Sequence, residues 1–231
     1  MSNSILKKVK VIKMRPSHLP VLMAVCRYFG PGSVIECGTG NMSTPYWMSQ
    51  GMEYTGIEHD PAWAKVTKKI IGGHGKLFVH PVKGVIFSTL FRMLTKKQKK
   101  SFADYYNGLA RNLKADVLFI DSFAAARIYA AVCLYDCADI IILHDSESRK
   151  YRYDKIGKFV RDNNKGEYLH YRYIPLGKTY SESKRPDPST DVLIKGHHIS
   201  AGFISRMFQE RLAEYNGKMY PGCEFKFEMI K

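Results

Sequence analysis

Short apolar runs alternate with helical spacings of apolar residues along the first two thirds of the chain. The runs predict β-strands at residues 33–37, 53–58, 76–80, 116–121 and 139–145. The segments between them predict helices, such as the one that Asp60 can cap and Pro61 can open. Strands and helices that alternate in this way are typical of an α/β fold, a doubly wound parallel sheet with helices on both faces.

Three regions depart from this alternation. Residues 20–29 have the apolar spacing of a helix, and a basic arm precedes them. Residues 82–100 combine apolar positions with a run of lysines, which suits either a lid or docking insertion, or an ordinary amphipathic helix with a solvated basic end. Further strands are predicted at 167–174 and 191–195, followed by a helix at 203–215.

These elements group into a single domain with appendages. We expect an N-terminal arm and helix at 1–32, an α/β core at 33–196 and a helical and irregular tail at 197–231. The chain has 231 residues, of which 45% are hydrophobic and 25% charged, as in ordinary globular domains. No apolar run predicts a transmembrane segment. The five cysteines are odd in number and lack paired spacing, so we expect free thiols and a reducing, cytoplasmic location. The oligomeric state is not indicated.

The charge balance adds a preference for certain partners. The chain carries 36 Lys and Arg residues against 21 Asp and Glu, a net charge of +15. Such an excess favours polyanions: nucleic acid, an anionic membrane surface, or an acidic or phosphorylated substrate. The alternative is a solvated basic surface, because the charge is spread along the chain rather than concentrated in one motif.

The segment 33–43 carries the most informative motif. It predicts a buried strand, a turn containing Gly38 and Gly40, and the start of a helix. Glycines allow the backbone to approach a ligand closely. Glu36 precedes the turn, where its carboxylate would repel a pyrophosphate but would suit a ligand that carries an amine or a hydroxyl. This combination favours an adenosyl cofactor with an amino-acid tail.

Acidic residues stand at or near the ends of several predicted strands. Because the ends of parallel strands meet at one edge of a sheet, Glu36, Glu58, Asp121 and Asp145 are expected to line one crevice. Glu58 follows the glycine turn at the distance at which a carboxylate binds the ribose hydroxyls of a nucleoside.

The candidates for chemistry are Asp121, His144 and Asp145. Asp121 and Asp145 end strands that we expect to be neighbours, so the two carboxylates could share a Mg²⁺ or Mn²⁺ ion. Alternatively, His144 could serve as a general base without a metal, or the histidine and Asp145 could be purely structural. Arg127, Arg149 and Tyr151 follow these strand ends and are candidates for binding the substrate. Tyr151, Tyr153 and Trp63 are candidates for stacking on adenine or a sugar.

The residues together resemble a known family. Glu36-Cys37-Gly38-Thr39-Gly40 is similar to the glycine motif of class I S-adenosylmethionine (SAM)-dependent methyltransferases, and Phe119-Ile120-Asp121 resembles their fourth-strand motif. The resemblance implies a Rossmann-like sheet of seven strands, mostly parallel, that closes with a late antiparallel pair. It implies SAM as the cofactor, bound by Glu36, Gly38, Thr39, Gly40, Asn41, Ser43, Glu58, His59, His80 and Asp121.

Within that superfamily, the residues from Ile120 to Asp145 resemble the glucuronoxylan-type sugar O-methyltransferases and, more loosely, the cation-dependent O-methyltransferases. The resemblance implies a sugar or glycan acceptor, which could be anionic, and a divalent metal at Asp121 and Asp145. Two positions depart from the pattern. Met42 replaces a frequent third glycine, and Ala124 stands where catechol-type enzymes have a lysine. Activation of the hydroxyl would therefore fall to Asp121, His144 or the metal.

Three other hypotheses stay open. The first is an RNA methyltransferase, which the charge favours, although no ribose-methylation tetrad or RNA-binding module is evident. The second is a non-catalytic binding protein on a methyltransferase fold, which the intact acidic residues disfavour. The third is a nicotinamide-dependent oxidoreductase, which Glu36 and the late antiparallel pair disfavour.

Overall fold

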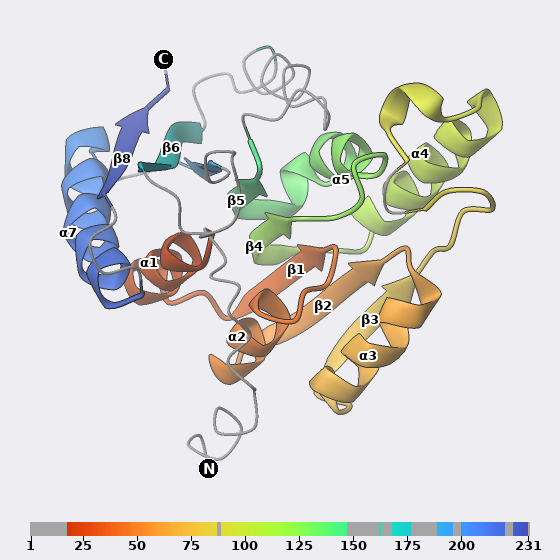
Figure 1. Ribbon diagram of the computed structural model, residues 1–231, viewed down its shortest axis with the longest axis horizontal. Coiled ribbons are helices and arrows are strands. Elements are labelled where there is room, and N and C mark those ends of the chain that lie inside the picture. Colours follow the sequence, from red (N-terminus) through yellow and green to blue (C-terminus); the bar gives the residue numbers. More distant parts are fainter. Residues whose placement is uncertain are drawn as a thin grey trace.

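Eight strands form one sheet through the centre of the molecule, in the order β3-β2-β1-β4-β5-β7-β6-β8 (Figure 1). The computed structural model describes residues 18–86, 89–146, 162, 168–176, 189–195, 200–219 and 224–230. The parallel strands are β1 (Ser33–Cys37), β2 (Glu53–Glu58), β3 (Gly75–Val79), β4 (Ala115–Ile120) and β5 (Ala138–His144). Three further strands complete the sheet through antiparallel pairings: β6 (Tyr168–Leu176), β7 (Thr190–Lys195) and β8 (Glu224–Met229).

Helices cover both faces of the sheet. The described helices are α1 (Leu19–Phe29), α2 (Ser43–Ser49), α3 (Pro61–Ile71), α4 (Lys96–Ala110), α5 (Arg127–Cys133) and α7 (Ala201–Met219), with short 3-10 turns η2 (Phe91–Met93) and η3 (Tyr135–Cys137). One hydrophobic cluster lies between the sheet and α4 and α5. The other lies on the opposite face, where α1, α2 and α7 pack. Apolar residues of the central strands contribute to both clusters, which explains their continuous apolar runs. None of the described helices is long and apolar enough to cross a membrane.

The register of the strands brings their carboxyl ends to one level. Cys37 at the end of β1 pairs with Ile57 of β2 on one side and with Ile120 of β4 on the other. The loops that follow these strands therefore emerge at the same edge. The strand order reverses between β1 and β4, and a crevice at such a reversal is the usual ligand site of an open α/β sheet.

The predicted α/β class is confirmed, with one correction to the number of strands. The late antiparallel pair is present as β6 and β7, but the sheet has eight strands instead of seven. The additional strand β8 lies in the tail that was expected to be helical and irregular. Its Phe227 is buried and stacks on Tyr171 of β6 and Phe208 of α7, with ring centroids 5.2 Å away in each case. This stacking fixes β8 on the sheet.

The segment 82–100 packs against the molecule in its described part. Leu94 is buried in the cluster under α4 and α5, and Val82, Val85 and Phe91 pack beside it. Thr95 then starts α4 with a capping box, in which Thr95 and Gln98 satisfy each other's backbone N–H groups. This placement favours the alternative of an amphipathic helix with a solvated basic end, and the role of a lid stays a prediction.

Candidate functional site

The turn after β1 holds the ends of three strands together. Gly38 has a left-handed φ of 84° and donates its N–H to the carbonyl of Ile57 at 2.8 Å. A Cβ atom at Gly38 would lie 2.3 Å from Cα of Ser122, so any side chain there would collide with the backbone after β4. On the other side, Asp121 donates its N–H to the carbonyl of Cys37 at 2.8 Å. The turn is therefore pressed directly against the loop that follows β4.

Glu58 links this turn to the loop after β2. Its Oε2 accepts the N–H and the hydroxyl of Thr39 at 3.1 and 2.9 Å, and its Oε1 accepts the N–H groups of His59 and Asp60 at 2.7 and 2.9 Å. The residue is only 3% exposed. Each oxygen thus has two donors, so the carboxylate organises both loops, and Glu58 also lines the adjacent cavity.

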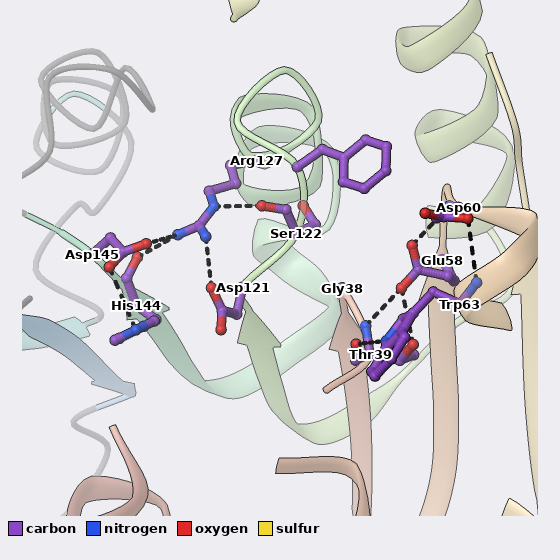
Figure 2. Close-up of a pocket in the computed structure, with 11 residues that line it drawn as sticks. Gly38, Thr39, Glu58, Asp60, Trp63, Asp121, Ser122, Arg127, His144 and Asp145 are labelled. Atoms are coloured by element: carbon purple, nitrogen blue, oxygen red, sulfur yellow. Dashed lines mark hydrogen bonds and ion pairs between the residues drawn. The ribbon is translucent and has the colours of Figure 1, made fainter. Parts of the chain in front are cut away.

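A cavity of about 440 Å³ opens between these loops, a size that suits a small-molecule ligand (Figure 2). Figure 2 shows one group of side chains from β2 and α3 and a second group from the ends of β4 and β5, with Gly38 between them. The lining residues are Gly38, Thr39, Glu58, Asp60, Trp63, Asp121, Ser122, Phe123, Arg127, His144 and Asp145.

The N-terminus of α3 forms one wall of the cavity. Asp60 caps the helix, because its Oδ1 accepts the N–H groups of Ala62 and Trp63 at 2.8 and 3.2 Å. The indole N–H of Trp63 donates to the carbonyl of Thr39, which fixes the ring beside the glycine turn. This wall therefore offers an aromatic surface and a carboxylate.

The hydroxyl of Ser122 has no hydrogen-bond partner among the described residues. It is buried, and it belongs to a residue that lines the cavity. Buried hydroxyls are normally hydrogen bonded, so a ligand in the cavity would supply what the protein does not.

Arg127, at the start of α5, joins the ends of β4 and β5. Its guanidinium donates to the carbonyl of Ser122 at 2.6 Å and to that of His144 at 2.8 Å, and it also pairs with two carboxylates. Oδ1 of Asp121 lies 2.6 Å from Nη2, and Oδ2 of Asp145 lies 3.0 Å from Nη1 (Figure 2). The residue is 3% exposed. It was expected to bind substrate, but in this structure its main contacts are internal.

The positions of Asp121 and Asp145 do not fit the expected shared metal ion. The Arg127 guanidinium bridges the two carboxylates and supplies the positive charge that the ion was expected to bring. Burial raises the pKa of Asp121, but the charges of His144 and Arg127 outweigh this and hold the pKa below its usual value. The pair is therefore an arginine-bridged acidic pair, and a Mg²⁺ or Mn²⁺ ion between these two residues finds no support in the geometry.

Asp145 has an unusual backbone that positions its side chain. It has a left-handed φ of 56°, which Asp tolerates better than most residues. In this conformation its Oδ1 lies 3.4 Å from Nε2 of His144, while its Oδ2 reaches Arg127. Nδ1 of His144 lies 3.3 Å from the hydroxyl of Thr190 on β7. Nδ1 of the His144 ring is thus hydrogen bonded, while Nε2 lies near Asp145 at the edge of the cavity.

Glu36 lies inside the protein and is absent from the cavity lining. It is fully buried, and its Oε2 accepts the hydroxyls of Thr44 and Tyr54 at 2.6 and 2.5 Å. Its Oε1 is buried without a partner in the described residues. Burial raises the pKa of Glu36 to about 7, although the hydroxyls of Ser43, Thr44 and Tyr54 act in the opposite direction. A direct contact between Glu36 and the amine of a ligand stays a prediction.

Other residues expected to bind the cofactor are placed outside the cavity lining. His59 is buried, with Nδ1 2.8 Å from the carbonyl of His80 and Nε2 2.9 Å from the hydroxyl of Tyr106, and burial lowers its pKa to about 4. His80 stacks on Tyr105 with ring centroids 4.0 Å apart. Gly40 and Asn41 precede α2, and Ser43 is its first residue. Gly40 donates its N–H to the hydroxyl of Thr44. Arg149, Tyr151 and Tyr153 lie outside the described residues.

His18 is a site residue that the sequence did not single out. It precedes α1 and packs against His144, with ring centroids 4.5 Å apart. It is 103 positions before Asp121 in the chain, and no local motif surrounds it. Only the fold brings it to the ends of β4 and β5.

Known proteins resemble this chain in structure rather than in sequence. No protein-family model matches the chain, and no curated protein matches it either. A methyltransferase-like protein from Silicibacter pomeroyi is 16% identical over 87% of this chain and 96% of its own, with a TM-score of 0.46. A TehB-like SAM-dependent methyltransferase from Corynebacterium glutamicum is 11% identical over 77% of this chain and 88% of its own, with a TM-score of 0.46. A putative RNA methyltransferase from Pyrococcus horikoshii is 14% identical over 78% of this chain and 82% of its own, with a TM-score of 0.45. At these values the similarities assign no function to individual residues.

Proposed function

We propose that the protein is a SAM-dependent methyltransferase that binds the cofactor in the cavity between β1, β2 and β4. The observation that carries the proposal is the meeting of the Gly38 turn and the Glu58 carboxylate in one cavity, at the point where the strand order reverses. A pyrophosphate would be repelled by Glu58, whereas the two hydroxyls of a ribose would be bound by it.

The residues of the cavity suit the parts of such a cofactor. Trp63 and Phe123 offer aromatic surfaces for an adenine, and the unpartnered Ser122 hydroxyl offers a hydrogen bond. A ribose hydroxyl can take the place of the Thr39 hydroxyl on Glu58, because Thr39 Oγ1 has a second partner in Thr67 Oγ1 at 2.6 Å. The loops could therefore accept a ribose without losing the backbone hydrogen bonds to Glu58.

The ends of β4 and β5 supply the groups that would face an acceptor. Asp121 keeps 27% of its side chain exposed, and His144 lines the same wall. We assign to these two residues the binding of an acceptor hydroxyl and the removal of its proton, with Arg127 and Asp145 as positioning residues. The cofactor, when bound, supplies a methyl group on a positively charged sulfur. The acceptor class that we propose is a sugar or glycan, because the sequence between Ile120 and Asp145 resembles sugar O-methyltransferases.

Calorimetry with SAM tests the cofactor assignment. The wild-type chain should bind SAM, and Glu58→Gln should weaken binding by at least about tenfold, since one charge-assisted hydrogen bond is worth roughly 1.5–3 kcal/mol. Glu53→Gln is the matched control, because Glu53 lies exposed at the other end of β2 and should not affect binding. Thermal denaturation of both variants shows whether the fold is retained. Absence of SAM binding to the folded wild type would overturn the proposal.

A second acceptor class is RNA, which the net charge of +15 favours. Incubation with methyl-labelled SAM and separate sets of glycans, RNA and small phenols would distinguish the acceptors. We expect label on a glycan hydroxyl. Label on RNA alone would replace the glycan assignment and keep the methyltransferase assignment, and label on none of them together with tight SAM binding would favour a binding protein on this fold.

A further inference from the structure

Three side chains from distant parts of the sequence meet beside the cavity. They are His18 before α1, Asp121 after β4 and His144 at the end of β5. One potential ligand atom of each lies within 4.8 Å of those of the other two. Two of the three line the cavity, and His18 lies behind them against His144 and Phe119.

His18 is the observation that requires an explanation. It is only 6% exposed, and neither of its ring nitrogens has a hydrogen-bond partner within the described part of the chain. A buried polar group without a partner is destabilising, and it is rare in folded proteins. An imidazole binds metals in its neutral form, through a ring nitrogen that has no other partner.

The charges around Asp121 are compatible with a bound cation. Arg127 binds Oδ1 of Asp121, while Oδ2 accepts no hydrogen bond from any described residue. With His144 neutral, the form that binds a metal, the carboxylates of Asp121 and Asp145 and the guanidinium of Arg127 sum to one net negative charge. A divalent ion would change the net charge from minus one to plus one, which is a small net charge for a partly open site.

We propose that His18, Asp121 and His144 form a binding site for one divalent transition-metal ion. Two imidazole nitrogens and one carboxylate oxygen match the preferences of Zn²⁺, Co²⁺ or Fe²⁺, whereas Mg²⁺ and Ca²⁺ select oxygen ligands. Bonds of about 2.1 Å place ligand atoms about 3–4 Å apart, so shifts of about 1 Å would close the site from its present spacing. Three protein ligands leave coordination positions open, as in catalytic rather than structural sites.

The open positions would face the cavity that Asp121 and His144 line. The next step rests on the proposed methyltransferase function. In that function the ion, instead of the Asp121 and His144 side chains, would bind the acceptor hydroxyl. The metal site itself does not depend on that function. It differs from the pair of Asp121 and Asp145 expected from the sequence. Both oxygens of Asp145 have partners in Arg127 and His144, whereas Arg127 binds only Oδ1 of Asp121.

Metal binding to the full chain, stripped with chelator and dialysed, tests the proposal. Titration with Zn²⁺ and with Co²⁺ in a calorimeter should show one site per chain, and elemental analysis after desalting should confirm the stoichiometry. His18→Ala should weaken Zn²⁺ binding by more than about 100-fold, since the loss of even an outer partner of a metal ligand costs 10–100-fold. His74→Ala is the matched control, because His74 is exposed in the turn after α3. The Zn²⁺ affinity of this variant should equal that of the wild type.

A second variant separates the metal site from simple packing. In the metal-free chain, His18→Leu should be as stable as the wild type or more stable, because an unpaired polar ring is replaced by an apolar group. Zn²⁺ should raise the melting temperature of the wild type and leave that of His18→Leu unchanged. A wild type that binds no metal, or a His18→Ala variant that binds it as tightly as the wild type, would overturn the proposal. SAM binding to the metal-free chain is measured separately, so failure of the metal site and failure of the methyltransferase assignment give different results.

Discussion

Two buried glutamates on neighbouring strands differ in how fully their oxygens are hydrogen bonded. Glu58 accepts two hydrogen bonds on each oxygen, from backbone N–H groups and the Thr39 hydroxyl. Glu36 accepts two on Oε2 and none on Oε1 within the described residues. Burial destabilises the ionised form of Glu36, and its hydrogen bonds compensate for this only in part. The pKa of Glu36 is therefore raised to about 7 from an ordinary value of 4.5.

This raised pKa predicts a dependence of stability on pH. Between pH 4.5 and 7 the folded state keeps a proton on Glu36 that the unfolded state loses, so the free energy of unfolding should fall as the pH rises. Glu36→Gln should remove this slope. Relative to the wild type, the variant should gain about 3 kcal/mol between pH 4 and pH 8. Urea denaturation across this range measures it, with the exposed Glu53→Gln as control, and parallel curves for wild type and Glu36→Gln would contradict the prediction.

Two glycines with left-handed φ angles allow strain and crowding to be separated. At Gly38 a Cβ would strike the backbone of Ser122, whereas at Gly30, with φ of 50°, it would meet nothing within 4 Å. Gly30→Ala should cost only about 1 kcal/mol, the conformational penalty alone. Gly38→Ala should cost about 3 kcal/mol or more, because the loop after β4 must move. Chemical denaturation of both variants tests this, and equal costs would show that the loop can yield.

At the scale of elements, two helix caps provide a comparison between stability and binding. Asp60 caps α3 beside the cavity, and Thr95 caps α4 away from it. Replacing either by Ala should cost about 1 kcal/mol of stability. Only Asp60→Ala should also weaken SAM binding, because Asp60 and Trp63 form a wall of the cavity. Denaturation and calorimetry on the two variants make the comparison, and equal SAM affinities would remove α3 from the binding site.

How far an element could be predicted depended on where its side chains lie. Strands β1 and β2 were predicted with their observed ends. Strands β4 and β5 were predicted within one residue, since their continuous apolar runs are typical of strands buried on both faces. Helix α5 starts at Arg127, because Ala124 to Ala126 before it form a turn. Strand β8 was missed, although the alternation of Phe225 and Phe227 with charged residues was its signal.

The site was predictable where it depends on strand ends. The bridging position of Arg127 and the approach of His18 depend on side-chain directions and distant contacts, which no local pattern contains.

At the scale of the whole molecule, the excess of positive charge should govern binding to polyanions. RNA affinity is expected to fall steeply between 50 and 200 mM salt, as counterion release requires. Lys96, Lys97 and Lys100 are exposed at the start of α4. Replacing them by Ala should make the slope of log affinity against log salt concentration shallower, by roughly 1 for each phosphate that the protein no longer neutralises. Filter binding at several salt concentrations measures it, with Ala at the exposed Lys65, Lys68 and Lys69 of α3 for comparison. An affinity that does not change with salt would exclude an electrostatic origin.

The position of β8 at one end of the sheet has a consequence for folding during synthesis. The parallel strands β1 to β5 can pair as soon as residues up to His144 have emerged from the ribosome, but β6 receives its second neighbour only when Glu224–Met229 arrive. Until then Tyr171 and Phe208 lack the Phe227 ring that stacks on both. An unpaired strand beside exposed aromatic rings invites pairing with other chains. In the finished chain, Glu224, Lys226 and Glu228 place alternating charges along the outer strand, which discourages a further strand from adding there.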